Sequence, residues 1–228
     1  MKSMKKNLNR YLSLTLVTAL ILLFSTCDAF ALKEINIPNL SKIKKMIIKY
    51  KESGDWAKEM EQQAQKGIAI IEEHHNKNVK QAIVFDIDET SLDNFAFYKK
   101  YDFGYNSDAW HKWMHENTAP AIKANLKLYK KAVEKGIAVF FITGRGEIKR
   151  EATEKNLKAA GYLIYKKLIL RDKNELGVPA AAYKSARRKE IERLGYEILL
   201  NVGDQYSDLE GGYSKFIIKY PNPIYFLK

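Results

Sequence analysis

The sequence contains a single cysteine among its 228 residues, and it has neither an internal repeat nor a low-complexity linker. Cys27 lies close to the N-terminus, so the rest of the chain has no thiol and can form no disulfide framework. A chain of this length without a linker is expected to form one domain, large enough for a hydrophobic core.

The sequence also lacks an apolar run long enough to span a bilayer comfortably, which takes about 20 residues. The uncharged apolar stretch 11–24 is shorter, and it lies between four basic residues and a group of small ones. This arrangement is typical of a secretory signal peptide. Because the A-x-A sequence at 29–31 is a suitable cleavage site, we predict a signal peptide at 1–31 and an exported protein, periplasmic or secreted, at 32–228.

Two alternatives remain for the N-terminal segment. The sequence FSTC at 24–27 resembles a bacterial lipoprotein box, although Phe24 and Thr26 depart from its usual pattern. In that case Cys27 would carry a lipid anchor and the protein would be an outer-membrane lipoprotein. The other alternative is an apolar anchor that is not cleaved. None of these predictions places a membrane span within 32–228.

Acidic residues are outnumbered, since 39 Lys and Arg against 27 Asp and Glu give a formal net charge of +12. The positive electrostatic field of such a protein attracts anionic substrates or anionic surfaces. The basic residues are scattered among glutamates rather than grouped, so most are expected on solvated helix faces. We therefore expect a small anionic partner and no nucleic-acid polymer.

Hydrophobic periodicity predicts alternating helices and strands over most of the chain. Short apolar runs predict strands at 81–86, 137–142, 167–170, 198–202 and 216–219. Amphipathic patterns predict helices at 39–51, 55–75, 120–135, 147–160 and 183–194. Strands that alternate with helices indicate an α/β fold in which helices cover both faces of a parallel sheet.

Polar groups follow three of the predicted strands. They are Asp86-Ile87-Asp88, Thr143-Gly144-Arg145, and Gly203-Asp204 with Asp208 beyond. Ligands of parallel sheets bind outside the carboxyl ends of the strands, so these groups are expected to converge. Four carboxylates in one crevice require a hard divalent cation, and oxygen-only ligands favour Mg²⁺ over zinc. With Lys184 and Thr143 as anion ligands, the group fits a phosphoryl site with a carboxylate nucleophile.

An insertion is predicted directly after the first acidic loop. Asp86 and Thr143 lie 57 positions apart, whereas a simple strand-helix-strand unit needs about 30 residues. Residues 93–118 are therefore expected to form a cap over the site. Its many aromatic residues form either a small cap core or a stacking wall for a nucleobase or aryl leaving group. Phe97, Tyr98 and Trp110 are the candidates for substrate contact.

Four motifs in this order resemble the haloacid dehalogenase (HAD) superfamily of phosphatases, and within it the class B and class C acid phosphatases and the plant vegetative storage proteins (subfamily IIIB). They are DIDET at 86–90, FITGR at 141–145, YKSARRKEIERLGY at 183–196 and NVGDQYSD at 201–208. PNPIYF at 221–226 also resembles the family, while Gln205-Tyr206 is closer to the plant storage proteins. The resemblance implies a HAD-like Rossmannoid three-layer sandwich with a parallel sheet, a small helical cap after the first motif, and N-terminal helices.

The resemblance also implies a role for each matching residue. Asp86 would be the nucleophile that forms a phosphoaspartyl intermediate, and Asp88 would protonate the leaving alcohol and then activate water. Thr143, Gly144 and Lys184 would hold the phosphoryl oxygens. Mg²⁺ would be bound by Asp86, the Asp88 backbone carbonyl, Asp204 and Asp208, the last directly, through water or as a support.

The predicted function is that of a secreted, Mg²⁺-dependent acid phosphatase that hydrolyses phosphate monoesters. An acidic optimum is expected because Asp88 must be protonated for the first step. The aromatic insertion suggests nucleoside monophosphates as substrates. Two alternatives remain: a catalytically weak storage or anion-binding protein on the same fold, and a phosphotransferase.

Overall fold

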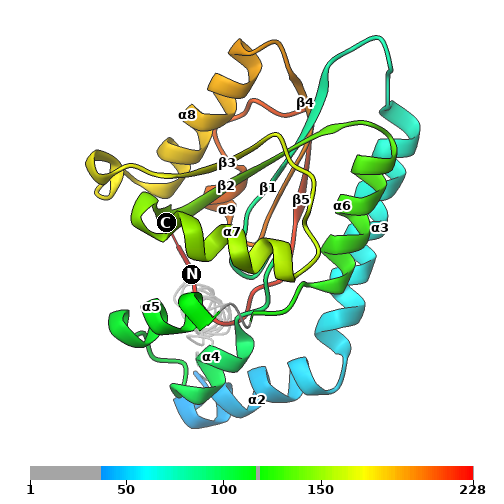
Figure 1. The fold of residues 1–228 in the computed structure, drawn as a ribbon. Coiled ribbons are helices and arrows are strands. Elements are labelled where there is room, and N and C mark those ends of the chain that lie inside the picture. Colours follow the sequence, from blue (N-terminus) through cyan, green and yellow to red (C-terminus); the bar gives the residue numbers. More distant parts are fainter. Residues whose placement is uncertain (1–36, 117–118, 228) are drawn as a thin grey trace, which may run out of the picture. The chain divides into compact units, whose positions relative to one another are not determined.

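The computed structural model describes residues 37–116 and 119–227, so the predicted signal peptide and Cys27 lie outside the described residues. Contacts divide the chain into a unit of residues 1–39 and a unit of residues 40–228. The second unit holds all the helices and strands described below (Figure 1). Within the described ranges, no helix has both the length and the apolar character that crossing a membrane requires.

Five parallel strands form one sheet in the order β3-β2-β1-β4-β5 (Figure 1). The strands are β1 (Gln81–Phe85), β2 (Ala138–Gly146), β3 (Lys167–Arg171), β4 (Glu197–Gly203) and β5 (Phe216–Lys219). All five residues of β1 are buried, as expected for a central strand that is covered on both faces. The predicted parallel α/β sheet is therefore confirmed.

Helices cover the two faces of this sheet and produce three layers. The helices are α2 (Leu40–Glu52), α3 (Asp55–His74), α4 (Phe95–Lys100), α5 (Ser107–Glu116), α6 (Lys123–Glu134), α7 (Arg150–Ala159), α8 (Ala180–Arg193) and α9 (Tyr206–Leu209). Side chains of β1 alternate between the faces, because Ile83 and Phe85 pack in one core cluster and Ala82 and Val84 in another.

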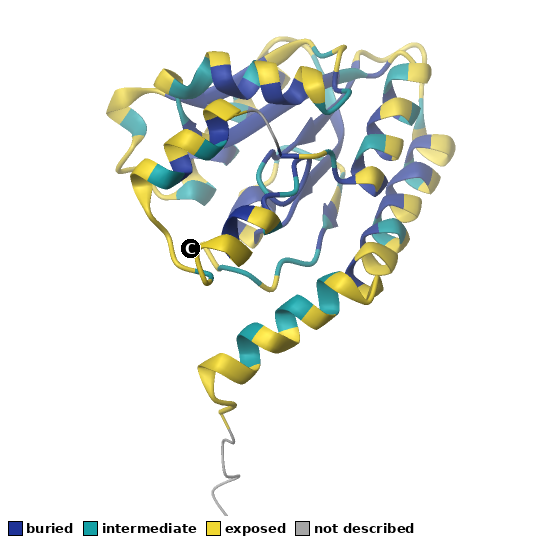
Figure 2. Cartoon of the chain, turned by 60° about the horizontal axis from the view of Figure 1, so that its bottom comes forward, coloured by how far each residue is buried: buried dark blue, intermediate teal, exposed yellow. Residues whose placement is uncertain are grey.

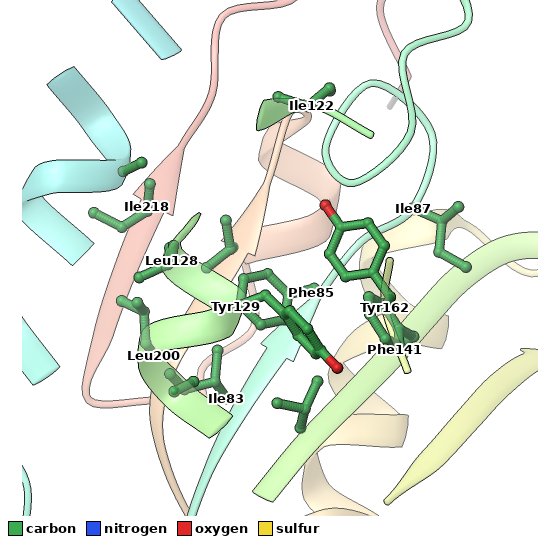
Figure 3. Packing of buried hydrophobic residues seen from close by; sticks show 14 of the residues in the cluster. Ile83, Phe85, Ile87, Ile122, Leu128, Tyr129, Phe141, Tyr162, Leu200 and Ile218 are labelled. Carbon is green, nitrogen blue, oxygen red and sulfur yellow. The ribbon is translucent and has the colours of Figure 1, made fainter. Parts of the chain in front are cut away.

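The larger cluster contains buried residues of α3, α6 and α7 (Figure 3). Leu128 and Tyr129 of α6 belong to it together with Phe85 and Phe141 of the sheet. The smaller cluster joins the opposite face to α8 through Tyr183 and Ile191. In Figure 2 the buried stripes of the helices face the dark blue strands in the interior of the sheet.

The two N-terminal helices, α2 and α3, differ in how much they contribute to the hydrophobic core. Helix α3 buries a continuous apolar stripe from Trp56 to Ile71, whereas α2 buries no residue. Gly54 joins the two helices with a φ of 88°, a conformation that favours glycine. Lys44 of α2 forms an ion pair with Asp102, in the loop between α4 and α5.

Between β1 and α6 the chain forms the short helices α4 and α5. Their side chains make a separate aromatic cluster around Phe97, Tyr98 and Trp110, which also includes Ala152 of α7. These helices occupy the segment for which a cap was predicted. Residues 117 and 118 of that segment lie outside the described residues.

The strand order reverses at β1, since β2 and β3 lie on one side of it and β4 and β5 on the other. Parallel sheets bind ligands at such a reversal, outside the carboxyl ends of the strands. The topology therefore places a crevice beside the ends of β1 and β4.

Candidate active site

The loop after β1 brings its acidic residues back over the end of the strand. Asp86 is tied to β4 by a hydrogen bond from its backbone N–H to the carbonyl of Val202 (2.9 Å). The backbone then turns sharply, because Ser91 and Leu92 both donate N–H groups to the carbonyl of Ile87. Glu89 takes the left-handed conformation that this turn requires, with a φ of 57°. The turn places two carboxylates, those of Asp86 and Asp88, at the crevice.

Three buried carboxylates and one lysine form the centre of the site. Oxygens of Asp86, Asp204 and Asp208 all lie within 4.8 Å of one another. Lys184, from the first turns of α8, donates to Asp208 Oδ1 (2.6 Å) and to Asp86 Oδ1. Arg187, Arg188 and Lys189 lie close to Lys184 in the sequence, so one of them could have been expected in this place instead. The structure brings Lys184 to the carboxylates.

The charges in this centre shift one another's protonation. Burial disfavours the charged form of Lys184, but the carboxylates of Asp208 and Asp86 outweigh it and raise the pKa of the lysine. Burial raises the pKa of Asp86 well above its ordinary value, although Lys184 opposes this shift and the neighbouring aspartates add to it. Asp86 and Lys184 therefore both bind a proton more tightly than an ordinary aspartate and an ordinary lysine do.

Asp88 has a different partner. Arg145, at the end of β2, donates to both of its oxygens, from Nε to Oδ2 (3.0 Å) and from Nη2 to Oδ1 (2.6 Å), and Asn94 donates to Oδ1 (2.9 Å). Burial alone would raise the pKa of Asp88, but Arg145 and these hydrogen bonds lower it overall. The carboxylate of Asp88 is thus held by a fork-like ion pair, away from the three-carboxylate centre.

Asp204 accepts three hydrogen bonds while it is almost fully buried (1% exposed). Thr90 Oγ1 donates to Oδ1 (2.9 Å), and both Gln205 Nε2 and Asn222 Nδ2 donate to Oδ2 (2.7 Å each). Burial and the charge of Asp208 raise the pKa of Asp204 to about 6, although the hydrogen bonds oppose this. Its side chain is therefore fixed in orientation by neutral donors.

Asp208 contributes to both the site and the local fold. Its Oδ2 accepts the backbone N–H of Gln205 (2.8 Å) in a reciprocal capping arrangement at the start of α9, and its Oδ1 accepts from Lys184. Gly203 makes this possible, because a Cβ at that position would lie 2.4 Å from Asp208 Cβ. Asp208 thus belongs both to the capping box of α9, whose N-cap is Gln205, and to the carboxylate centre.

The two predicted phosphate ligands from β2 are placed differently. Gly144 lines the crevice. Thr143 is fully buried, and its hydroxyl accepts the backbone N–H of Arg145 (3.2 Å). β2 continues to Gly146, four residues beyond the predicted strand end, because its pairing with β3 resumes after a shift in register at Ile142.

The crevice opens into a cavity of about 560 Å³. Its lining combines the four aspartates and Lys184 with five aromatic side chains, and with aliphatic ones such as Leu176, Val178 and Ile224. The aromatic wall residues are Tyr98, Phe103, Tyr105, Trp110 and Tyr225. Two of the three cap candidates, Tyr98 and Trp110, therefore line the cavity that contains the carboxylates. Phe97 does not line the cavity: it is fully buried beneath the wall and packs edge-on against both rings.

The donor set fits a hard metal ion. Five carboxyl groups lie here, Asp86, Asp88, Glu89, Asp204 and Asp208, and only two cationic groups, Lys184 and Arg145, form ion pairs with them among the described residues, although Lys149 and Arg171 also line the cavity. Such an excess of buried negative charge is costly unless a cation compensates it. The oxygens of Asp86, Asp204 and Asp208 are close enough to share one ion, and oxygen ligands are those that Mg²⁺ prefers.

Sequence reasoning named no role for several residues of the site. Arg145 was present in the motif at 141–145, but nothing in that pattern indicated its pairing with Asp88. Glu89 was likewise part of a motif, and its carboxylate accepts from Tyr225 OH (2.7 Å) and from the backbone N–H of Asn94 (3.0 Å). Asn222 lies in the segment at 221–226, which resembles the family but for which the resemblance implied no role.

The fold and the site together define an α/β protein of the HAD type. Among solved structures, the chain is similar to the class C acid phosphatase from Bacillus anthracis, with a TM-score of 0.67 and 25% identity over 82% of this chain and 86% of that chain. The same phosphatase with tungstate bound gives a TM-score of 0.66. The model of the HAD superfamily, subfamily IIIB (acid phosphatase), matches residues 18–228. The chain belongs to this family, as the motifs predicted.

Three curated relatives of the chain come from plants. The chain is 41% identical to "Stem 28 kDa glycoprotein" of Glycine max, over 65% of this chain and 61% of the relative. It is 40% identical to "Acid phosphatase 1" of Solanum lycopersicum, over 63% and 58% respectively. It is 34% identical to "Vegetative storage protein 2" of Arabidopsis thaliana, over 63% and 56%. The matched region thus spans about three-fifths of the length of these relatives.

Proposed function

We propose that this protein is a Mg²⁺-dependent acid phosphatase that hydrolyses phosphate monoesters through a phosphoaspartyl intermediate. The observation that carries the proposal is the convergence of Asp86, Asp204, Asp208 and Lys184 at the carboxyl end of the sheet, under a cavity with aromatic walls. Family membership and the relative named as an acid phosphatase support the same activity.

In the first step the carboxylate of Asp86 attacks phosphorus, and the bond between phosphorus and the ester oxygen breaks. Asp88 gives its proton to that oxygen, so the alcohol leaves neutral. Lys184 stabilises the negative charge of the phosphoryl oxygens, with the Thr143 hydroxyl and the Gly144 backbone as further donors. Asp86, the Asp88 carbonyl, Asp204 and Asp208 would hold Mg²⁺, which would neutralise charge on the phosphoryl group and orient it.

In the second step Asp88, now ionised, accepts a proton from water as the water attacks the phosphoryl group. The acyl phosphate bond to Asp86 breaks, which releases inorganic phosphate and restores both carboxyl groups. Arg145 orients the ionised Asp88 in this second step, because its fork fixes the direction of the carboxylate. The first step requires protonated Asp88, so the activity has an acidic optimum.

Turnover of a panel of phosphate monoesters, with Mg²⁺ and with EDTA, tests the proposal. We expect hydrolysis of p-nitrophenyl phosphate that EDTA abolishes and Mg²⁺ restores. Asp86→Asn and Asp88→Asn should each remove it, while Glu192→Gln, an exposed carboxyl-to-amide change in α8, should not. Undiminished hydrolysis by Asp86→Asn would show that the nucleophile lies elsewhere.

The aromatic residues that line the cavity favour substrates with a flat leaving group. We propose that these substrates are nucleoside monophosphates. Tyr98 and Trp110 line the cavity at a ring separation of 6.0 Å. Tyr98→Ala and Trp110→Ala are expected to lower kcat/KM for nucleotides much more than for small alkyl phosphates. Equal losses for both substrates would refute the stacking role.

A second candidate is a catalytically weak storage or anion-binding protein, which the relatives named as vegetative storage proteins favour. This alternative predicts no turnover of any ester and a stability that does not depend on Mg²⁺. A phosphotransferase would instead move phosphate to added alcohols faster than to water. The glycoprotein names of other relatives accord with export, which we propose for residues 32–228, with the lipid anchor at Cys27 as the alternative.

A further inference from the structure

The segment 221–227 follows β5 and runs back to the crevice. Figure 1 shows this last part of the ribbon passing from β5 beneath the sheet toward the region of α4 and α5. Ile224, Tyr225 and Leu227 line the cavity that contains the carboxylates. The segment has no regular secondary structure, so its position depends on specific side-chain contacts.

Those contacts join the segment to both acidic loops. Tyr225 OH donates to Glu89 in the loop after β1 (2.7 Å). Gln205, in the loop after β4, donates from Nε2 to the Tyr225 carbonyl (3.3 Å) and accepts the Leu227 N–H at Oε1 (3.0 Å). The segment is therefore bound to both acidic loops, at Glu89 in one and at Gln205 in the other.

Asn222, in the same segment, binds the carboxylate of Asp204. Asn222 Nδ2 donates to Asp204 Oδ2 at 2.7 Å, and its own Oδ1 accepts the Ile224 N–H at 2.8 Å. The second bond is a local turn that fixes the orientation of the amide. The amide of Asn222 consequently presents a donor, and not an acceptor, to the buried carboxylate.

A carboxylate has about four acceptor positions. Asp204 uses three of them for Thr90, Gln205 and Asn222, which leaves one position for a cation. We infer that Asn222 is a positioning residue for Asp204, and that the segment 221–227 belongs to the metal centre as a support. Groups that orient a ligand in this way change metal affinity by about 10–100-fold when they are removed.

This inference rests on the proposed Mg²⁺ site, and its test separates the two. Asn222→Ser retains a side-chain oxygen for the Ile224 N–H and is too short to reach Asp204. Phe226→Ala is the matched control, because Phe226 lies in the same segment, is 68% exposed and does not line the cavity. Mg²⁺ binding to the full-length protein is measured by isothermal titration calorimetry with magnesium chloride.

We expect the Kd for Mg²⁺ to rise about tenfold or more in Asn222→Ser and to stay unchanged in Phe226→Ala. The Mg²⁺ concentration for half-maximal hydrolysis should rise by the same factor, while kcat at saturating Mg²⁺ stays within about twofold of wild type, because excess Mg²⁺ refills a weakened site by mass action. A merely structural role would lower kcat as well.

Equal Mg²⁺ affinity of wild type and Asn222→Ser would overturn the inference and leave the proposed function intact. Absence of Mg²⁺ binding by the wild type would overturn both. Circular dichroism establishes that each variant is folded, and Asn222→Ala provides the same comparison should the serine variant unfold.

Discussion

Asp204→Asn should stabilise the protein in the absence of metal, although it removes a proposed metal ligand. Asp204 is 1% exposed, and burial together with Asp208 raises its pKa to about 6 from an ordinary value of 3.8. An asparagine can replace it without loss of hydrogen bonds. The amide oxygen would accept from Gln205 and Asn222, and the amide nitrogen would donate to the Thr90 hydroxyl.

The magnitude follows from the shift in pKa. Each unit is worth about 1.4 kcal/mol, so an ionised Asp204 costs the folded state about 3 kcal/mol above pH 6. The folded pKa lies above the unfolded one, so this cost is absent below the unfolded pKa and is fully present once the pH exceeds the folded pKa. Asparagine carries no such cost at any pH.

Chemical unfolding in EDTA at pH 4 and pH 8 measures this difference. We expect Asp204→Asn to be more stable than wild type by up to about 3 kcal/mol at pH 8 and nearly equal to it at pH 4. Glu192→Gln should differ little from wild type at either pH. Added Mg²⁺ should stabilise the wild type and leave the asparagine variant unchanged. The reasoning would be refuted if Asp204→Asn were less stable than wild type at pH 8, or if it were more stable than wild type by the same free energy of unfolding at both pH values.

Three further predictions concern the framework of the site and can be checked by chemical unfolding. Gly203→Ala should cost about 1–3 kcal/mol and reduce activity, because its Cβ would collide with Asp208, whereas Gly177→Ala meets nothing within 4 Å and should be neutral. Arg188→Met should cost about 3 kcal/mol or more, since the fully buried guanidinium donates to three backbone carbonyls around α9. Leu128→Ala should cost about 2–5 kcal/mol by leaving a cavity between α6 and the sheet, with no change in Mg²⁺ affinity.

Much of the fold could be predicted because its elements are locally encoded. The apolar run at 81–86 matches β1 to within one residue, and the pattern at 55–75 matches α3 equally well. The rule that ligands bind at the carboxyl ends of parallel strands then predicts that Asp86 and Asp204 are neighbours. The structure places them in the same carboxylate centre.

The rest depends on contacts between residues that are far apart in the chain. Four neighbouring basic residues of α8, Lys184, Arg187, Arg188 and Lys189, were candidates for the same place, yet Lys184 is the one that pairs with the aspartates of the site. Arg187 instead pairs with Glu175 and Glu190, and Arg188 binds carbonyls. Their different directions follow from the rotation of the helix over the sheet, and no local pattern determines it.

The same limit applies to the aromatic insertion and to the pairs that orient the aspartates. Phe97 and Tyr98 are adjacent in α4, but one packs beneath the wall and the other lines the cavity. The partners of Asp88 and Asp204 lie 57 and 18 positions away. Such pairings are consequences of tertiary packing, so sequence periodicity carries no signal for them.

Mass spectrometry of acid-quenched protein tests the central claim most directly. Wild-type protein mixed with p-nitrophenyl phosphate and Mg²⁺, then quenched in acid and digested, should yield the peptide containing Asp86 with one added phosphoryl group. Hydroxylamine should remove that group, as expected of an acyl phosphate, and Asp86→Asn should carry none. Turnover without any labelled peptide, or a label on a different residue, would contradict the assignment of Asp86 as the nucleophile.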